Sequence, residues 1–224
     1  MSQSRKSLSI GATVAIAIAL GAVVGAAGIY WKASPSGNAP ATESLASADG
    51  AACMVDPEML AKLKPLAKGE VAAMAVREEP VALPDLSFVS EQGDALTLAD
   101  FAGQAMLVNL WATWCAPCRE EMPALAELQS ELGDDEFKVL TINIDTGDAA
   151  KPKAFLDEIG VANLGLYRDA SMGVFNTLKK EGLAFGLPVT LMVGKDGCML
   201  GAMNGPAEWA SKDAKALVGA LKGV

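Results

Sequence analysis

Residues 109–123 read NLWATWCAPCREEMP, and this stretch decides the fold because it places a cysteine pair between two different kinds of element. The apolar run at 104–110 that leads into it is typical of a strand buried on both faces of a sheet. Residues 117–132 follow with a helical pattern, in which Pro123 is expected to introduce a kink. The sequence therefore predicts that a buried strand ends just before the cysteine pair and that a helix begins at it.

The spacing of Cys115 and Cys118 puts both sulfurs within bonding reach on one helical turn. The first cysteine lies at the helix N-terminus, where unpaired backbone N–H groups and the helix dipole favour an anion. The thiolate of Cys115 is therefore expected to be stabilised relative to that of a free cysteine. We predict that Cys115 is the catalytic nucleophile of thiol–disulfide exchange and that Cys118, one turn inward, is the resolving thiol.

Other uses of a C-x-x-C pair fit the sequence less well. A zinc site would need a second cysteine pair, but Cys53 and Cys198 each stand alone in the sequence. Covalent haem attachment needs a histidine after the second cysteine, and the residue there is Arg119. An inert structural disulfide stays open as an alternative, although the start of a helix is a reactive environment for a dithiol.

Composition excludes several classes of function. The chain has 224 residues, a formal net charge of -9 and no histidine. Without histidine there is no Ser-His-Asp or Cys-His hydrolase and no His-bearing zinc or haem site. The acidic balance argues against a nucleic-acid partner, because phosphates would be repelled. We predict no cofactor and no metal site, and the length suits one sizeable domain with accessory segments.

The beginning of the chain predicts a membrane anchor. Residues 8–30 are almost all apolar, which is long enough to cross ~30 Å of hydrocarbon at ~1.5 Å per residue. Arg5 and Lys6 precede this run and aromatic residues follow it, so residues 1–7 are expected in the cytoplasm and the rest outside it. A cleaved signal peptide is the alternative, although its apolar region usually has about 7–15 residues.

The rest of the chain predicts a linker, a short extension and one α/β domain. Residues 31–50 are small and polar and indicate a flexible linker, and residues 51–79 form an N-terminal extension. In that extension the sequence Asp56-Pro57-Glu58 predicts the start of a helix over 59–68. The domain spans 80–224, and its order of elements implies a mixed sheet covered by helices on both faces. Its other expected elements are extended stretches at 86–89 and 95–98, a strand at 137–145, a helix at 153–159, a looser stretch at 164–182, a hairpin of 189–193 with 198–202, and a closing helix at 208–222.

Two motifs together resemble those of the TlpA-like membrane-anchored thioredoxins. They are the stretch 109–123 and Gly186-Leu187-Pro188-Val189-Thr190, and the resemblance covers about residues 80–224. It implies an α/β thioredoxin fold, with a mixed central sheet flanked by helices, an N-terminal helical extension and a transmembrane anchor. It also implies dithiol–disulfide exchange outside the cytoplasm.

The same resemblance assigns further site residues by position. Pro188 would be a cis-proline facing the dithiol, and Leu187 would offer its backbone to an extended substrate segment, as an added strand does. Trp114 and Pro117 would complete the substrate groove.

Residues 109 and 121 separate this chain from ordinary thioredoxins. Ordinary members of that group have a buried aspartate six residues before the first cysteine, where this chain has Asn109. Many TlpA-like proteins instead have an acid three residues after the second cysteine, and Glu121 matches it. Glu121 is therefore a candidate for proton transfer with Cys118. The alternative is that it is only a favourable acid in the first turns of a helix.

The remaining two cysteines indicate which branch of the TlpA-like family the chain resembles. If Cys115 pairs with Cys118, Cys53 and Cys198 are left as a structural disulfide that an oxidising compartment would permit, or as two separate buried thiols. This additional pair resembles the alphaproteobacterial branch of the TlpA-like family. That branch implies a reductant for cytochrome oxidase copper-site assembly, with a Sco-type copper chaperone and the copper-binding oxidase subunit as partners.

We consider three functions for the chain. The first is a single-pass protein of the bacterial inner membrane, with its catalytic domain in the periplasm and a membrane electron donor. The second is the same chemistry directed at apocytochrome c during cytochrome c maturation. The third is a non-enzymatic module that uses the scaffold to hold a partner or copper, since soft thiolates suit Cu(I).

Overall fold

The computed structural model describes Cys53 and residues 57–223. The predicted cytoplasmic N-terminus (1–7), membrane anchor (8–30) and linker (31–50) lie outside the described residues, as does Asp56 of the predicted helix start. Within the described part of the chain, no helix has both the length and the apolar character needed to cross a membrane.

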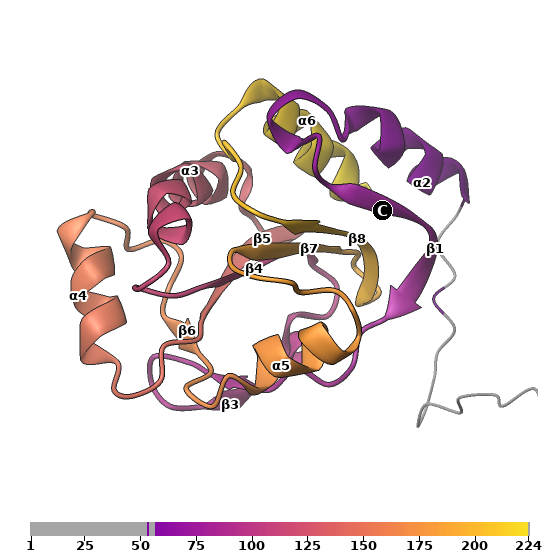
Figure 1. The fold of residues 1–224 in the computed structure, drawn as a ribbon. Coiled ribbons are helices and arrows are strands. Elements are labelled where there is room, and N and C mark those ends of the chain that lie inside the picture. Colours follow the sequence, from indigo (N-terminus) through magenta and orange to yellow (C-terminus); the bar gives the residue numbers. More distant parts are fainter. Residues whose placement is uncertain (1–52, 54–56, 224) are drawn as a thin grey trace, which may run out of the picture. The chain divides into compact units, whose positions relative to one another are not determined.

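One mixed sheet of eight strands forms the centre of the described structure (Figure 1), and it confirms the predicted mixed sheet. Parallel pairing joins β4 to β5 and β5 to β6, whereas the β4–β7, β7–β8, β8–β1, β6–β2 and β2–β3 pairs are antiparallel. In order across the sheet the strands are β1 (Ala75–Ala82), β8 (Cys198–Asn204), β7 (Val189–Val193), β4 (Ala105–Trp111), β5 (Phe137–Asn143), β6 (Tyr167–Arg168), β2 (Phe88–Val89) and β3 (Ala95–Leu96).

Helices cover the sheet on both faces. Figure 1 shows α2 and α6 side by side on one face, with α3 on the same side and α5 on the opposite side. The α-helices are α2 (Pro57–Leu63), α3 (Ala116–Leu132), α4 (Ala150–Glu158), α5 (Gly173–Lys180) and α6 (Lys212–Leu221). Three short 3-10 helices lie among the described residues, namely η1 (Lys64–Leu66), η2 (Gly69–Val71) and η3 (Leu98–Phe101).

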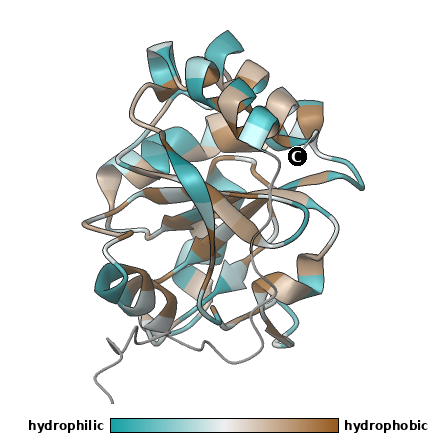
Figure 2. Ribbon diagram, turned by 90° about the vertical axis from the view of Figure 1, so that its right-hand side faces the viewer, coloured by the Kyte–Doolittle hydropathy of each residue, from teal (hydrophilic) through white to brown (hydrophobic). Residues whose placement is uncertain are grey.

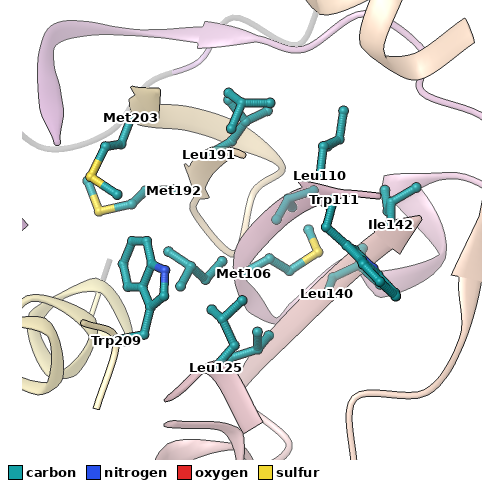
Figure 3. Close-up of a cluster of buried hydrophobic side chains, with 14 of the residues drawn as sticks. Met106, Leu110, Trp111, Leu125, Leu140, Ile142, Leu191, Met192, Met203 and Trp209 are labelled. Atoms are coloured by element: carbon teal, nitrogen blue, oxygen red, sulfur yellow. The ribbon is translucent and has the colours of Figure 1, made fainter. Parts of the chain in front are cut away.

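The core lies between the sheet and these helices. Every residue of β4 is buried, as expected for a central strand with helices on both faces. The central strands in Figure 2 are largely hydrophobic, whereas the helices carry both hydrophilic and hydrophobic bands. Figure 3 shows Trp209 pointing into the same cluster as Met192 and Met203, and its side chain is fully buried. The segment just before α6 is therefore fixed to the sheet by a large aromatic side chain.

Four segments differ from the sequence-based expectation. The helix predicted over 59–68 is the shorter α2, followed by the 3-10 turn η1, because Pro65 has no N–H to continue the α-helical hydrogen bonds. The looser stretch at 164–182 contains β6 and the helix α5, which the Asp169 carboxylate supports by accepting the Val174 N–H at 2.7 Å. The strand β1 was not expected, because its sequence AVREEPVA is charged and its place depends on pairing with β8. The closing helix begins at Lys212 rather than at 208, since the Ser211 side chain caps it by accepting the Ala214 N–H.

Candidate active site

The ends of three strands meet at one edge of the sheet. Leu110 near the end of β4 pairs with Val189 at the start of β7, and Val189 pairs in turn with Asn204 at the end of β8. The segments that follow β4, precede β7 and follow β8 therefore all emerge at this edge. These segments contain, respectively, the cysteine pair, Pro188 and the loop that leads to α6.

The cysteine pair lies at the first turn of α3 in its oxidised form. Cys115 is the N-cap residue, and its sulfur accepts a hydrogen bond from the Cys118 N–H at 3.3 Å. A disulfide joins the two residues, whose Cα atoms are 5.3 Å apart. Cys115 is 6% exposed and Cys118 is completely buried. Of the two residues, only Cys115 has any exposed surface, and its sulfur is also the one that receives the helix N–H.

Of the residues assigned to the substrate groove, Trp114 and Pro117 adjoin the cysteines in sequence, whereas Leu187 and Pro188 lie just before β7. The Leu187–Pro188 peptide bond is cis, and the Pro188 carbonyl accepts the Gly205 N–H at 2.9 Å. Pro188 is buried, Leu187 is half-buried, and Trp114 is strongly exposed. Pro117 is half-buried within the first turn of α3.

Glu121 is a buried acid surrounded by hydrogen-bond donors. Its Oε1 accepts from Asn109 Nδ2 at 2.8 Å, and its Oε2 accepts from Trp209 Nε1 at 3.0 Å. A third donor, the Ala207 N–H, lies 3.2 Å from Oε2. Burial raises the pKa of Glu121 from its ordinary value of 4.5 to about 7, although the three hydrogen bonds act in the opposite direction. The carboxyl group is therefore poised to change its protonation state near neutral pH.

Asn109 connects Glu121 to the strand that follows the cis-proline. Its Nδ2 also donates to Thr190 Oγ1 at 3.0 Å, and Thr190 lies two residues after Pro188. Asn109 pairs in register with Thr190 on β7 and with Thr141 on β5, so three polar side chains form a row inside the sheet. Asn109 Oδ1 and Thr141 Oγ1 are buried without a protein hydrogen-bond partner.

A shallow hollow beside the dithiol reaches this acid. It is lined by Pro117, Glu120 and Glu121 from α3 and by Glu70 from η2, and residues 206–208 complete it. Glu121 is only 3% exposed, and it contributes to the lining of this hollow.

A second buried acid holds the loop in front of the cysteines. The Asp145 carboxylate, which follows β5, accepts the Thr113 N–H at 3.1 and 3.2 Å and Asn143 Nδ2 at 3.1 Å. The Arg168 guanidinium donates to the carbonyls of Asp145 and Gly147, at 3.2 and 2.9 Å. The backbone two residues before Cys115 is thereby fixed to the neighbouring strand.

Cys53 and Cys198 are joined by a second disulfide, with 5.7 Å between their Cα atoms. Cys198 is the first residue of β8, whereas the site lies at Asn204, the last residue of that strand. At ~3.3 Å per residue, the two ends of a seven-residue strand are ~20 Å apart. This disulfide is therefore remote from the dithiol and attaches the N-terminal segment to the sheet. Among the described residues, no group of three or more His, Cys, Asp or Glu side chains is arranged to hold a metal ion.

Sequence reasoning named Asn109 and Glu121 separately, but it predicted none of the hydrogen bonds of Glu121 and none of those of Thr113. Trp209 had one usable signal, because an indole N–H requires an acceptor when it is buried. Asp145 had a weaker one, as the carboxylate that ends the predicted strand at 137–145. Thr190 and the Ala207 N–H had no local signal at all.

Comparisons with known proteins agree with this geometry. The Redoxin family model matches residues 78–218. "Thioredoxin-like protein YneN" of Bacillus subtilis (strain 168) is 40% identical over 76 residues, which cover 33% of this chain and 44% of that protein. "Thiol:disulfide interchange protein CycY" of Rhizobium leguminosarum bv. viciae is 34% identical over 114 residues, covering 50% of this chain and 56% of that protein. The matched stretch is thus about half the length of these curated relatives.

A solved structure shows the same fold. The thiol:disulfide interchange protein, thioredoxin family protein, from Chlorobium tepidum TLS superposes with a TM-score of 0.52 at 23% identity. The superposition covers 64% of this chain and 97% of that protein. The likeness confirms the predicted thioredoxin fold, with a mixed sheet and flanking helices.

Proposed function

Because this chain belongs to the Redoxin family, we propose that it is a thiol:disulfide oxidoreductase that reduces disulfide bonds in other proteins. The observation that carries the proposal is the place of Cys115 at the first turn of α3, where the Cys118 N–H donates to its sulfur. In the reduced protein, this N–H and the helix dipole stabilise a thiolate at the same position. The thiolate is the form that attacks a disulfide.

The reaction takes place in two exchange steps. The Cys115 thiolate attacks one sulfur of the client disulfide, and the other client sulfur leaves as a thiolate. The Cys118 thiolate then attacks Cys115 in the mixed disulfide, so the second client sulfur leaves and the Cys115–Cys118 disulfide forms. The protein dithiol loses two electrons and two protons, and the client disulfide gains them.

We propose that Glu121 accepts the proton that the Cys118 thiol loses. Cys118 is fully buried and must lose its proton before it can attack the mixed disulfide. Glu121 lies one helical turn further along α3, and its pKa of about 7 lets it accept a proton near neutral pH. The hollow beside Pro117 lets the carboxyl group return that proton to solvent.

We further propose that the protein works as a membrane-anchored reductant in the bacterial periplasm. The support is the apolar segment at 8–30, preceded by Arg5 and Lys6. The disulfide between Cys53 and Cys198 is compatible with an oxidising compartment. Such a reductant needs electrons from a membrane donor, because its own dithiol is consumed in each cycle.

The client class that we favour is the copper-site cysteines of cytochrome oxidase assembly, on a Sco-type chaperone and on the copper-binding oxidase subunit. Copper sites built from cysteine pairs have to be reduced before the metal binds, because the thiolate is the ligand. The support for this choice is the second cysteine pair, Cys53 and Cys198, and its resemblance to the alphaproteobacterial branch. Apocytochrome c is the second client class, and non-enzymatic holding of a partner or of copper is the third proposal.

Substitution of each active-site cysteine tests the proposed reaction. Cys115→Ser is expected to abolish reduction of a protein disulfide, and full activity in that variant would refute the proposal. Cys118→Ser is expected to accumulate the mixed disulfide on Cys115. Incubating this variant with a purified oxidised copper chaperone and, separately, with an oxidised C-x-x-C-H segment of apocytochrome separates the two client classes.

Two further measurements decide the direction of electron flow and the non-enzymatic alternative. Equilibration of Cys115 and Cys118 in glutathione buffers is expected to give a reduction potential in the range of reductants, near that of thioredoxin at about −270 mV, and a value near about −120 mV would reverse the direction. Stoichiometric Cu(I) binding without any disulfide reduction would favour the binding module.

A further inference from the structure

Two large apolar side chains are exposed at the edge of the sheet that carries the dithiol. Trp114, directly before Cys115, is 60% exposed, and Phe185, three residues before Pro188, is 78% exposed. Val89, the other large apolar side chain that stands out as exposed in the described part of the chain, lies on β2, which is three strands away from β4 in the sheet. Exposed aromatic rings on both segments that flank a reactive disulfide indicate a surface that binds another molecule.

The exposure of Phe185 is imposed by a fixed backbone. The Phe185 N–H donates to Asn204 Oδ1 at 2.8 Å, and Asn204 Nδ2 donates to the Leu183 carbonyl at 3.1 Å. The Gly205 N–H holds the Pro188 carbonyl at the other end of the same loop. The ring is therefore presented to solvent by a loop that is anchored on both sides, which lowers the entropic cost of binding against it.

Acidic side chains line the hollow that adjoins the first turn of α3. Glu70, Glu120 and Glu208 are exposed and line the hollow that also contains Pro117. None of these three carboxylates has an ion pair within the described residues. Arg119 is the cation of the motif, and its guanidinium lies over the Phe155 ring at 4.9 Å from the centroid. The hollow is therefore a negatively charged surface that no cation of the described chain neutralises.

We propose that this surface selects client segments in which the disulfide cysteine has an apolar side chain on one side and a lysine or arginine on the other. The apolar side chain packs against Trp114 and Phe185, and the cation faces Glu120 and Glu208. The inference rests on the proposed function, because the occupant is placed by the attack of Cys115 on its disulfide. Charge complementarity at this position accelerates encounter and favours basic clients over acidic ones.

Four synthetic peptides test the inference with the full, reduced chain. Each carries one cysteine as a mixed disulfide with the chromogenic thiol 2-nitro-5-thiobenzoate, flanked by Leu or Ser on one side and by Lys or Glu on the other. The Cys115 thiolate attacks the peptide sulfur and releases the coloured thiol, and Cys118 then releases the peptide thiol as the Cys115–Cys118 disulfide forms. Each rate constant is divided by that of the same peptide with glutathione, which removes the intrinsic reactivity of the peptide.

The normalised rates are expected to follow both flanking residues. The Lys peptides react about tenfold faster than the Glu peptides at low salt, because each exposed charge pair changes the rate by about two- to fivefold. Glu208→Gln lowers this ratio to about threefold, and high salt lowers it as well. Phe185→Ala reduces the preference for Leu over Ser from about fivefold to less than twofold, since the packing surface is lost.

Matched controls lie at other parts of the sheet. Asp135→Asn removes an exposed carboxylate from the turn before β5, at the edge opposite the dithiol, and is expected to leave the Lys-to-Glu ratio unchanged. Val89→Ala removes an exposed apolar side chain on β2 and is expected to leave the Leu-to-Ser ratio unchanged. Equal normalised rates for all four peptides, or an equal effect of the control variants, would overturn this inference alone. If the chain reduces no disulfide, including the symmetric 5,5′-dithiobis(2-nitrobenzoate), the proposed function fails and the inference fails with it.

Discussion

The side-chain amide of Asn109 on β4 donates to the carboxylate of Glu121 on α3, with 2.8 Å between Nδ2 and Oε1. Asn109 lies six residues before the first active-site cysteine, and Glu121 lies three residues after the second. The two residues therefore tie the strand that precedes the site to the helix that follows it. Because the bond is buried, it acts directly on the protonation of Glu121.

We predict that the stability of the oxidised protein falls as pH rises from about 4.5 to about 7. Burial raises the pKa of Glu121 to about 7 in the folded state, whereas the unfolded chain titrates near 4.5. The folded state thus holds a proton that the unfolded state has already lost, so the stabilisation is fully present below 4.5 and is lost through 7. The expected loss in the free energy of unfolding is on the order of 3 kcal/mol, measured by denaturant titration at several pH values.

The Glu121→Gln variant serves as the control for that pH dependence, because glutamine does not titrate. Its free energy of unfolding is expected to be flat across the same window, although it loses a hydrogen bond to one of the three donors. The chain has no histidine, so no imidazole titration obscures the window. Hydrogen bonds from Lys64 and Lys222 lower the pKa values of Glu78 and Asp134, respectively. These two acids therefore change the free energy of unfolding below the pH range in which Glu121 titrates. A pH-independent wild type would contradict the prediction.

We predict that Asn109→Ala moves the titration of Glu121 to higher pH. The hydrogen bond from Asn109 favours the charged carboxylate, so its removal raises the pKa further. The fall in stability should then continue above pH 7, and the variant should lose about 1–3 kcal/mol because a buried carboxylate loses a partner. Carbon-13 NMR titration of the Glu121 carboxyl group measures the shift directly.

Thr190→Val is the matched control for the Asn109 variant. It removes the other acceptor of the Asn109 amide without touching Glu121, so the carboxyl pKa should change far less. A downward shift in Asn109→Ala, or equal shifts in both variants, would show that the amide does not control the acid.

The position of the dithiol could be predicted from sequence, because its signals are local. An apolar strand followed directly by a cysteine pair and a helical pattern placed Cys115 at a helix start, and α3 begins at Ala116. The order of the longer elements likewise indicated a mixed sheet. The short strands β2, β3 and β6 have two residues each, and strands of that length carry little or no periodic pattern.

The environment of Glu121 could not be predicted, because its partners are distant in the chain. Trp209 is 88 residues away from Glu121, and Thr190 is 81 residues away from Asn109. In the sequence Thr190 is a single polar group in an apolar stretch, and Trp209 stands in the mixed stretch PAEWASKD. Only the pairing of β4 with β7 and the packing of the segment before α6 bring these residues to Asn109 and Glu121. Whether burial or hydrogen bonding dominates the pKa also depends on that packing.

We predict that Asp145→Ala loosens the loop in front of Cys115. The substitution removes the acceptor of the buried Thr113 N–H, which costs about 2–3 kcal/mol when no other partner replaces it. Amide hydrogen exchange at residues 113–115 is expected to become faster. Asp148→Ala, which removes an exposed carboxylate that accepts the Ala150 N–H, should cost less than about 1 kcal/mol and leave exchange at 113–115 unchanged. Equal effects of the two variants would contradict a specific role for Asp145.

The two disulfides are expected to differ in what they contribute to stability. Cys53 and Cys198 are 145 residues apart in the sequence, so their bond restricts a long loop of the unfolded chain and is worth about 5 kcal/mol in the chain-entropy account. Cys115 and Cys118 are three residues apart, and the same account gives their bond about 2 kcal/mol. Denaturant unfolding of the Cys53→Ser/Cys198→Ser and Cys115→Ser/Cys118→Ser variants should therefore show the larger loss for the remote pair. Disulfide reduction by the Cys53→Ser/Cys198→Ser variant should stay at the wild-type rate, because Cys198 lies at the opposite end of β8 from the site. A smaller loss for the remote pair than for the active-site pair would refute this division between a structural and a reactive disulfide.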